Sequence, residues 1–188
     1  YRRIKTQTLL GNVPWPVGVG NRFMYFCLVK ENSYTTMLNK NAKDGKLMMI
    51  SNTLYQQWRQ AKAAGRKQFV VLIDPDKLHL REVDALVDLA EQAKVDSFFI
   101  GGSLVVNDAL DDLIQGIKQR SAIPTVLFPG SSRQLSYKAD ALLLLSLISG
   151  RNPELLIGKH VETAPYLKIS PLEIISTGYM LIDGGVPT

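Results

Sequence analysis

The clearest pattern in the chain is a run of five consecutive apolar residues at 69–73, which ends at Asp74. An unbroken apolar run of this length, rich in β-branched residues, predicts a strand that is buried on both faces, as the strands of parallel sheets are. Pro75 has no amide hydrogen for a sheet ladder, so the strand is expected to stop before it. Asp74 is therefore predicted to lie at the carboxyl end of a buried strand, the edge at which parallel α/β proteins bind ligands.

From residue 51 onward the chain repeats this plan of apolar strand, polar or glycine-rich exit and amphipathic helix. Further strands are predicted at 97–100, 125–128, 141–145 and 173–182. Helices are predicted from a cap at Ser51 or Asn52 to a stop at Gly65, and at about 80–93, 110–117 and 153–164. Strands that alternate with helices predict a parallel sheet with right-handed connections. Such strands fit either an open doubly wound sheet or an incomplete TIM barrel, which has eight strands when complete.

The first fifty residues do not share this regularity. They show no sustained helical or alternating period, and Gly and Pro residues interrupt the stretch from 11 to 20. They hold eight Lys and Arg against two acidic residues, a net charge of +6, whereas residues 51–188 carry a net charge of −1. We expect residues 1–47 to be a poorly ordered basic extension outside the core, and 48–188 to form the domain. The alternative is an arm that binds nucleic acid or an anionic membrane.

Composition narrows the class of protein. With 188 residues, 46% apolar and 21% charged, the chain can bury a sizeable core as one globular domain. The single cysteine, Cys27, excludes an internal disulfide framework and fits a reducing compartment. No apolar run approaches the roughly 20 residues that span a bilayer, and no signal peptide is recognisable, so a cytoplasmic location is expected.

Common catalytic signatures do not occur in the sequence. We find no nucleophile elbow, Walker loop, dinucleotide fingerprint or cysteine metal cluster. His79 and His160 are isolated, and neither lies in a metal-ligand spacing, so both are expected to be surface residues. The residues alone therefore leave the catalytic group unassigned.

Five segments at the predicted strand ends do carry a resemblance. They are Leu72-Ile-Asp-Pro-Asp-Lys77, Ile100-Gly-Gly-Ser103, Val126-Leu-Phe-Pro-Gly-Ser131, Ser149-Gly-Arg-Asn-Pro153 and Thr177-Gly-Tyr-Met-Leu-Ile-Asp-Gly-Gly185. In order and spacing they resemble the geranylgeranylglyceryl phosphate synthase family in its bacterial, flavobacterial-type branch, over about residues 51–188. The resemblance implies an α/β fold of the (β/α) TIM-barrel type, here incomplete, with about five of eight strands present.

The resemblance also implies an activity. Members of this family are prenyltransferases that join sn-glycerol 1-phosphate to geranylgeranyl diphosphate, with Mg²⁺, to form an ether-lipid precursor. The expected partners are these two substrates and further copies of the chain, with a possible peripheral membrane contact and no nucleic acid. The length of the prenyl donor depends on the depth of an apolar groove, which the sequence does not give.

The resemblance assigns the metal to Asp74 and Ser103. Mg²⁺ is usually held by one or two protein oxygens together with water and substrate phosphate, and it neutralises a departing diphosphate. Adjacent strand ends would supply such oxygens. The alternative for Asp74 is a turn or capping carboxylate before Pro75, and the alternative for Ser103 is a hydroxyl at the start of a helix.

Two further residues are candidates for substrate binding. Gly102 would let the backbone approach a phosphate, although a tight turn from strand to helix explains it equally well. Tyr179 could point into the barrel mouth toward glycerol phosphate, or be a buried tyrosine bonded to the backbone. Glu173 is expected to lie at a strand or helix terminus rather than to act as an internal carboxylate.

Family members continue beyond the fifth strand. Three more strands carry a Tyr-Leu-Glu segment and two glycine-rich loops that bind the glycerol phosphate, and this sequence stops before them. We therefore expect a C-terminally truncated member that keeps the metal half of the site and lacks the phosphate half. Two other hypotheses stay open: another phosphate-binding barrel enzyme, which would need an acid–base pair that is not evident, and a non-catalytic fragment with a basic arm.

Overall fold

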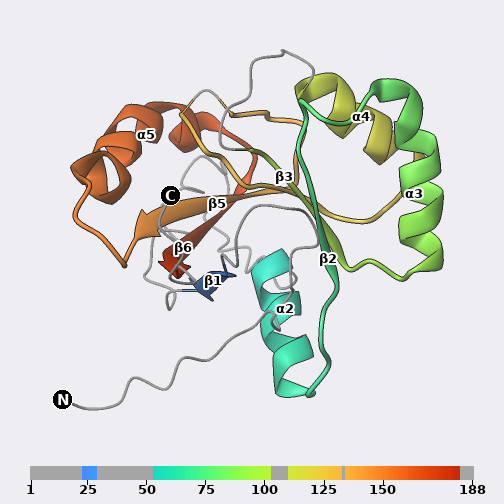
Figure 1. Ribbon diagram of the computed structural model, residues 1–188, viewed down its shortest axis with the longest axis horizontal. Helices are drawn as coiled ribbons and strands as arrows, with labels where there is room; N and C mark the ends of the chain where they lie inside the picture. Colours follow the sequence, from blue (N-terminus) through green and yellow to red (C-terminus); the bar gives the residue numbers. More distant parts are fainter. Residues whose placement is uncertain (1–22, 29–52, 103–109, 133, 183–188) are drawn as a thin grey trace, which may run out of the picture.

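The computed structural model describes residues 23–28, 53–102, 110–132 and 134–182, and its centre is a six-stranded sheet (Figure 1). The strands are β1 (Phe23–Leu28), β2 (Val70–Ile73), β3 (Ser97–Ile100), β4 (Thr125–Leu127), β5 (Ala141–Leu147) and β6 (Glu173–Ile182). They lie in the order β1-β6-β5-β4-β3-β2. Neighbours from β2 to β6 pair in parallel, and β1 pairs antiparallel with β6.

Four α-helices of the described residues precede or connect the parallel strands. They are α2 (Leu54–Ala63), α3 (Val83–Gln92) after the 3₁₀ turn η1 (Leu80–Glu82), α4 (Leu110–Arg120), and α5 (Lys159–Ile169) after the π-helical turn η2 (Glu154–Gly158). Helix α2 comes before β2, and β4 and β5 are joined by a loop. In Figure 1, α3 and α4 lie side by side on one face of the sheet, and α2 lies on the other. None of the helices in the described ranges is long and apolar enough to cross a membrane.

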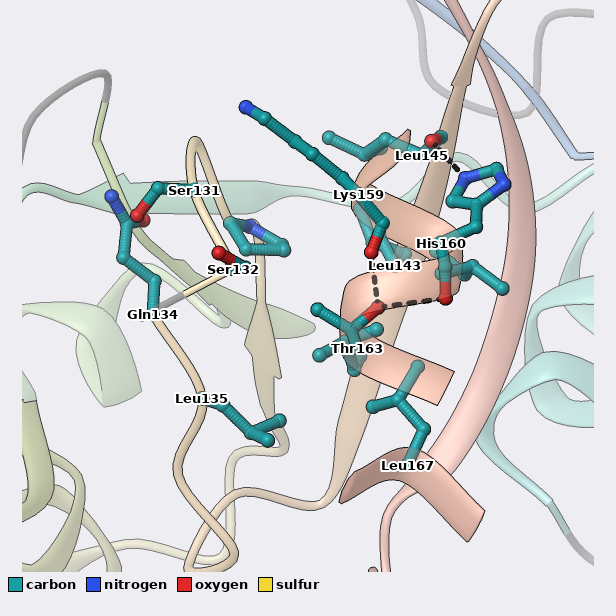
Figure 2. A pocket seen from close by; sticks show the side chains of 13 residues that line it. Ser131, Ser132, Gln134, Leu135, Leu143, Leu145, Lys159, His160, Thr163 and Leu167 are labelled. Carbon is teal, nitrogen blue, oxygen red and sulfur yellow. Dashed lines mark hydrogen bonds between the residues drawn. The ribbon is translucent and has the colours of Figure 1, made fainter. Parts of the chain in front are cut away.

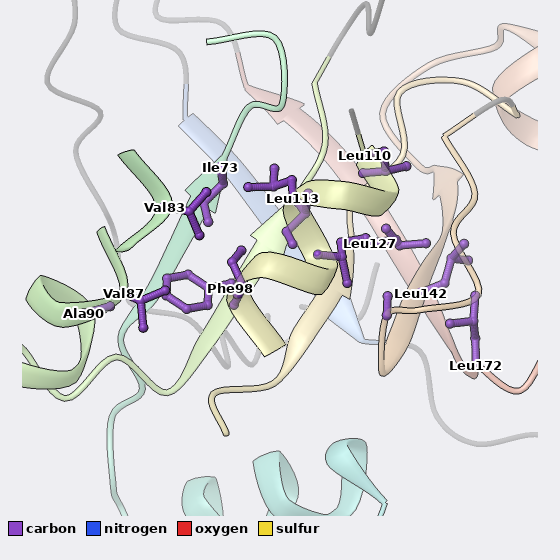
Figure 3. Packing of buried hydrophobic residues seen from close by; sticks show 14 of the residues in the cluster. Ile73, Val83, Val87, Ala90, Phe98, Leu110, Leu113, Leu127, Leu142 and Leu172 are labelled. Atoms are coloured by element: carbon purple, nitrogen blue, oxygen red, sulfur yellow. The ribbon is translucent and has the colours of Figure 1, made fainter. Parts of the chain in front are cut away.

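Successive residues of the central strands face two separate cores, because side chains alternate across a sheet. Phe98 belongs to the cluster that α3, α4 and α5 cover, and Figure 3 shows its ring beside Val87 of α3. Phe99 faces the opposite side, where Trp58 of α2 packs with its ring centroid 6.0 Å away. Both faces of β3 are therefore covered, and all four of its residues are buried. This confirms a parallel sheet covered on both sides at β3. The prediction that the run at 69–73 is buried on both faces is wrong: β2 is the edge strand of the sheet, only Ile73 of its four residues is buried, and Phe69 is 47% exposed.

The elements agree closely with the predicted ranges. The strands predicted at 97–100 and 173–182 have those bounds, and the remaining strand and helix ends differ by a few residues. The predicted cap of α2 is wrong: the cap is Thr53, whose Oγ1 accepts the Gln56 amide at 3.2 Å, while Ser51 and Asn52 lie outside the described residues. Gly65 does follow this helix, with φ at 68°.

β1 is the element that the sequence pattern did not predict. It lies within residues 1–47, where we expected no part of the core, yet it pairs with β6 from Phe23 opposite Ile182 to Leu28 opposite Thr177. Its six residues, FMYFCL, are an unbroken apolar run with aromatic side chains, which favours a strand. An open edge of β6 would present unpaired backbone groups, and β1 satisfies them. The domain boundary at residue 48 stays a prediction.

Candidate functional site

The candidate site lies at the carboxyl ends of three neighbouring strands. β2, β3 and β4 are adjacent and parallel, so the residues that follow them meet at one edge of the sheet. Asp74 follows β2, Gly101 and Gly102 follow β3, and the loop after β4 runs through Gly130 to Gln134. The sequence prediction placed Asp74 and Gly102 at this edge, and the structure brings them together.

Asp74 is partly exposed and already makes two contacts. Its side chain is 25% accessible; Oδ1 accepts the amide of Asp76 at 3.2 Å, and Oδ2 lies 2.8 Å from Nζ of Lys77. The hydrogen bond and the negative charge of Asp74 raise the pKa of Lys77. The Asp76 contact is that of a turn carboxylate, as the alternative interpretation predicted. It leaves part of the carboxylate accessible to a ligand.

The two glycines after β3 allow close backbone approach on both sides. Gly101 has a φ of 158°, and a Cβ there would lie 1.9 Å from the carbonyl oxygen of Phe128. A Cβ on Gly102 would lie 3.0 Å from Oδ1 of Asp74. The first position therefore requires glycine, and the second brings the β3 exit against the carboxylate of Asp74.

Gln134 joins two of these loops and was missed by the sequence analysis. Only 4% of its surface is exposed. Its Nε2 donates to the carbonyl of Gly102 at 2.8 Å, and its Oε1 accepts the amides of Gly130 at 3.0 Å and of Gly102 at 3.4 Å. A single glutamine in a polar loop carries no periodic signal, so no pattern in the chain could have indicated it.

Tyr179 lies further along the same edge, on β6. Its ring meets that of Phe128 edge to face, with 6.5 Å between the ring centroids, and its carbonyl accepts the amide of Ile148 at 2.8 Å. Phe128 packs against the hydrophobic cluster beneath α2, so the ring of Tyr179 lies on the face of the sheet that α2 covers, near the strand ends. This position agrees with a side chain at the mouth of the site; contact with glycerol phosphate stays a prediction.

A small cavity of about 50 Å³ lies beside this edge, between β5, α5 and the loop after β4 (Figure 2). Its walls are mainly apolar and include four consecutive leucines of β5, at 142–145. Nζ of Lys159 donates to the carbonyl of Gly130 at 2.6 Å, and Nε2 of His160 lies 2.6 Å from the carbonyl oxygen of Leu145. His160 is thus half-buried and hydrogen-bonded, so its prediction as a surface residue is wrong. His79 is exposed, as predicted.

The donor atoms limit what the site can bind. Among the described residues there is no group of three or more His, Cys, Asp and Glu that could enclose a metal ion. Ser103, the second predicted ligand, lies outside the described residues. One accessible carboxylate beside a glycine backbone suits Mg²⁺, which takes much of its coordination from water and phosphate oxygens. The residues present therefore fit a magnesium ion that arrives with its substrate.

The sequence model of the PcrB family matches residues 57–187, which include the three strand ends of the site. The chain belongs to the PcrB family.

Relatives of this PcrB-family chain include curated synthases. It is 56% identical over 139 residues to the geranylgeranylglyceryl phosphate synthase of Chitinophaga pinensis, covering 74% of this chain and 55% of that protein. The synthase of Flavobacterium johnsoniae is 46% identical over 139 residues, covering 74% of this chain and 57% of that protein. The chain spans about half the length of these curated relatives.

Solved structures show the same relationship. The synthase of Thermoplasma acidophilum, in complex with substrate sn-glycerol-1-phosphate, matches with a TM-score of 0.62 and 31% identity, over 66% of this chain and 50% of that chain. The wild-type enzyme from Thermoplasma volcanium matches with a TM-score of 0.61 and 28% identity, with the same coverage. With the five parallel strands β2 to β6, this likeness confirms the predicted family and the α/β fold of TIM-barrel type.

Proposed function

We propose that this PcrB-family chain provides the metal-binding edge of a prenyltransferase that joins sn-glycerol 1-phosphate to geranylgeranyl diphosphate, a step of ether-lipid biosynthesis. The observation that carries the proposal is the 56% identity to a curated synthase, in a region of family similarity that includes Asp74 and Gly102. The Thermoplasma acidophilum relative is described in complex with sn-glycerol-1-phosphate, which supports the same acceptor here.

Asp74 would hold the magnesium ion. When bound, Mg²⁺ would neutralise the diphosphate as it leaves the prenyl group. Lys77 now occupies Oδ2 of Asp74, so a metal must share this carboxylate or displace an exposed ammonium group from it. Gly102 would keep the backbone close beside this carboxylate, and Tyr179 would face the glycerol phosphate. The structure assigns no general acid or base.

The two substrates differ in what they need from the protein. The diphosphate needs positive charge and backbone donors, while the prenyl chain needs apolar surface. Within the described ranges, the leucine-lined cavity between β5 and α5 offers such a surface beside the strand ends. This cavity lies on the α5 face, however, opposite the face that carries Tyr179, and a volume of about 50 Å³ is too small for a prenyl chain, so we assign no part of the donor's chain to it.

Lipid substrates also give a reason for a peripheral membrane contact. Ile157, Val161, Pro165 and Ile169 repeat every fourth residue along η2 and α5, and all four are exposed; Ile169 is 74% accessible. The opposite side of α5 lines the cavity through Thr163 and Leu167. We propose that this apolar stripe contacts the membrane that supplies the prenyl donor. Homo-oligomerisation and a cytoplasmic location stay proposals; they rest on the family resemblance and the single cysteine, respectively.

A vesicle-binding experiment tests the membrane contact. The chain should sediment with vesicles of phosphatidylcholine and phosphatidylglycerol, and Val161→Glu should abolish this. Leu89→Glu is the matched control, because Leu89 is 63% exposed on α3, outside the stripe. Equal sedimentation of the two variants would argue against a lipid-facing stripe. So would a wild-type chain that does not sediment with the vesicles.

Calorimetric titration tests the proposed substrate. Geranylgeranyl diphosphate should bind the purified chain in the presence of Mg²⁺, and chelation with EDTA should remove the binding. Donors of shorter and longer chain should bind more weakly. Binding that ignores Mg²⁺, or a clear preference for a donor of another length, would overturn the assignment.

A further inference from the structure

We infer that Gln134 is a positioning residue that fixes the backbone of Gly102 against Asp74, and thereby sets the geometry of the site to which the metal is assigned. The claim about the metal site rests on the proposed function. The claim that Gln134 fixes Gly102 does not, since it follows from the contacts of three loops. Nothing in the family match or in the relatives' names assigns a role to this glutamine.

Burial makes the hydrogen bonds of Gln134 consequential. A polar side chain that is 4% exposed has lost most of its water, so each unmade bond would carry the full desolvation penalty. The amide makes three bonds with two backbone segments, on Gly102 and Gly130. The amide group is therefore held on both its donor and its acceptor side.

The bonds to Gly102 extend the sheet beyond its last backbone pair. The Phe128 amide donates to the Ile100 carbonyl at 2.8 Å, and the Gly101 amide donates to the Ile73 carbonyl at 3.0 Å. At the next residue, the side-chain amide of Gln134 accepts from the N–H of Gly102 and donates to its carbonyl. The primary amide thus pairs with a peptide unit as a neighbouring strand would. It fixes the chain where the parallel ladder ends.

Gly102 transmits this restraint to Asp74. A Cβ added to Gly102 would lie 3.0 to 3.3 Å from three atoms of the Asp74 carboxyl group, so the glycine backbone forms a wall against this side chain. A shift of the Gly102 backbone by a few tenths of an ångström would change the space in which the Asp74 carboxylate and its ligand must fit. Metal sites depend on such supporting contacts around their ligands.

Three variants separate positioning from general stability. Gln134→Met keeps the length and apolar stem and removes all three bonds. Gln134→Glu keeps the shape; when protonated it can still donate and accept, and when ionised it can only accept. Ser136→Ala is the matched control, because Ser136 is a buried polar residue of the same loop, 2% exposed, whose Oγ accepts the Lys138 amide at 3.2 Å.

The first measurement needs no metal. Amide NMR of the purified chain should show that Gln134→Met shifts the Gly102 and Gly130 resonances and speeds hydrogen exchange at Gly102 by about tenfold, as expected for one lost hydrogen bond. Gln134→Glu should give wild-type resonances at low pH and shifted ones at high pH. Native Gly102 resonances and exchange in Gln134→Met, or no difference from Ser136→Ala, would overturn the inference.

The second measurement uses Mn²⁺ as the probe, followed by its paramagnetic resonance. The apparent Kd for Mn²⁺ should rise about tenfold in Gln134→Met and stay unchanged in Ser136→Ala. A wild-type chain that binds no Mn²⁺ would contradict the proposed metal site, while the Gly102 resonances would still decide whether Gln134 fixes this loop. If Gln134→Met fails to fold, the pH series on Gln134→Glu decides the same question.

Discussion

At the scale of single residues, the structure shows which parts of the site the sequence could indicate. Asp74 was predictable because it ends an apolar run, and a polar residue at that point is easily noticed. Gly102 was predictable as a close approach, although the structure shows that its neighbour is Asp74. Gln134 was not predictable, because its role comes from two loops that the fold brings together. Residues that act across loops leave no local pattern.

Gly101 should be the least replaceable glycine of the described chain. In Gly101→Ala the new Cβ would lie 1.9 Å from a backbone carbonyl oxygen, so the β3 exit must move and about 3 kcal/mol of stability should be lost. Gly65→Ala is the control: Gly65 has φ at 68° but nothing within 4 Å, so the loss should be about 1 kcal/mol. Urea unfolding compares the two. A smaller loss for Gly101→Ala than for Gly65→Ala would refute the steric argument.

Asp140 should make part of the stability depend on acid pH. Burial opposes its charge, but hydrogen bonds from Lys118 and from the amide and hydroxyl of Thr125 outweigh burial and lower the pKa of Asp140 below its ordinary 3.8. A lowered folded-state pKa stabilises the fold above pH 3.8, and this stabilisation disappears as pH falls through the lower value.

Asp140→Asn should therefore cost about 1–2 kcal/mol at neutral pH, a figure reduced for the partial exposure of this side chain. The difference from wild type should vanish in strong acid. Asp111→Asn is the control, because its carboxylate lies 3.6 Å from Lys138 and is 52% exposed. Denaturant unfolding at several pH values measures both. A difference that stays constant from pH 7 to pH 2 would rule out this linkage.

At the scale of elements, most strands and helices follow from periodicity, while their caps and partners do not. The range of β6 was predicted correctly, yet no pattern could show that Glu173 at its start caps a helix 119 residues earlier. β1 was missed because its short apolar run is flanked by glycine, proline and charged residues. Its pairing with β6 depends on tertiary contacts, which the local sequence pattern does not indicate.

Glu173 should hold α2 on the sheet. Its carboxylate accepts the amides of Leu54 at 2.7 Å and Tyr55 at 3.0 Å, at the positive end of the helix. Glu173→Ala should cost about 1–2 kcal/mol, the range for a lost N-terminal cap. Because Trp58 is buried on α2, its fluorescence should shift to longer wavelength at lower denaturant concentrations than in wild type. Thr53→Ala, which removes the local cap, is the comparison; no shift in either variant would contradict a capping role.

At the scale of the whole molecule, the two edge strands of the sheet, β2 and β1, differ in character. β2 forms one edge beside the candidate site, and β1 covers the other by pairing antiparallel with β6. The alternation of strands and helices predicted the parallel part of this sheet correctly. The family resemblance could not predict β1, since it covers only about residues 51–188.

Deletion of residues 1–47 tests the role of β1. From the sequence alone we expected this deletion to leave the thermal midpoint unchanged, whereas the register of six paired residues with β6 now leads us to expect a lower midpoint. A drop of roughly 5 °C or more would correspond to a loss of about 2 kcal/mol in a chain of this size. Calorimetry gives the midpoint, and light scattering detects association through the exposed β6 edge. An unchanged midpoint without association would support the original prediction that residues 1–47 are an extension outside the domain core.

The central claim is that Asp74 holds magnesium for a prenyl diphosphate at the edge formed by β2, β3 and β4. Its most direct test is calorimetric titration of geranylgeranyl diphosphate into wild type, Asp74→Asn and the control Asp96→Asn, with Mg²⁺ varied. Asp96 lies before β3, at the opposite end of that strand, where it pairs with Arg66. Asp74→Asn should keep the fold, because the exposed pair with Lys77 contributes at most about 1 kcal/mol.

The account predicts that Asp74→Asn weakens binding about a hundredfold, equivalent to about 2.7 kcal/mol, and abolishes its dependence on Mg²⁺. Asp96→Asn should bind as wild type does. A folded Asp74→Asn chain that binds the diphosphate with wild-type Kd and the same Mg²⁺ requirement would contradict the account.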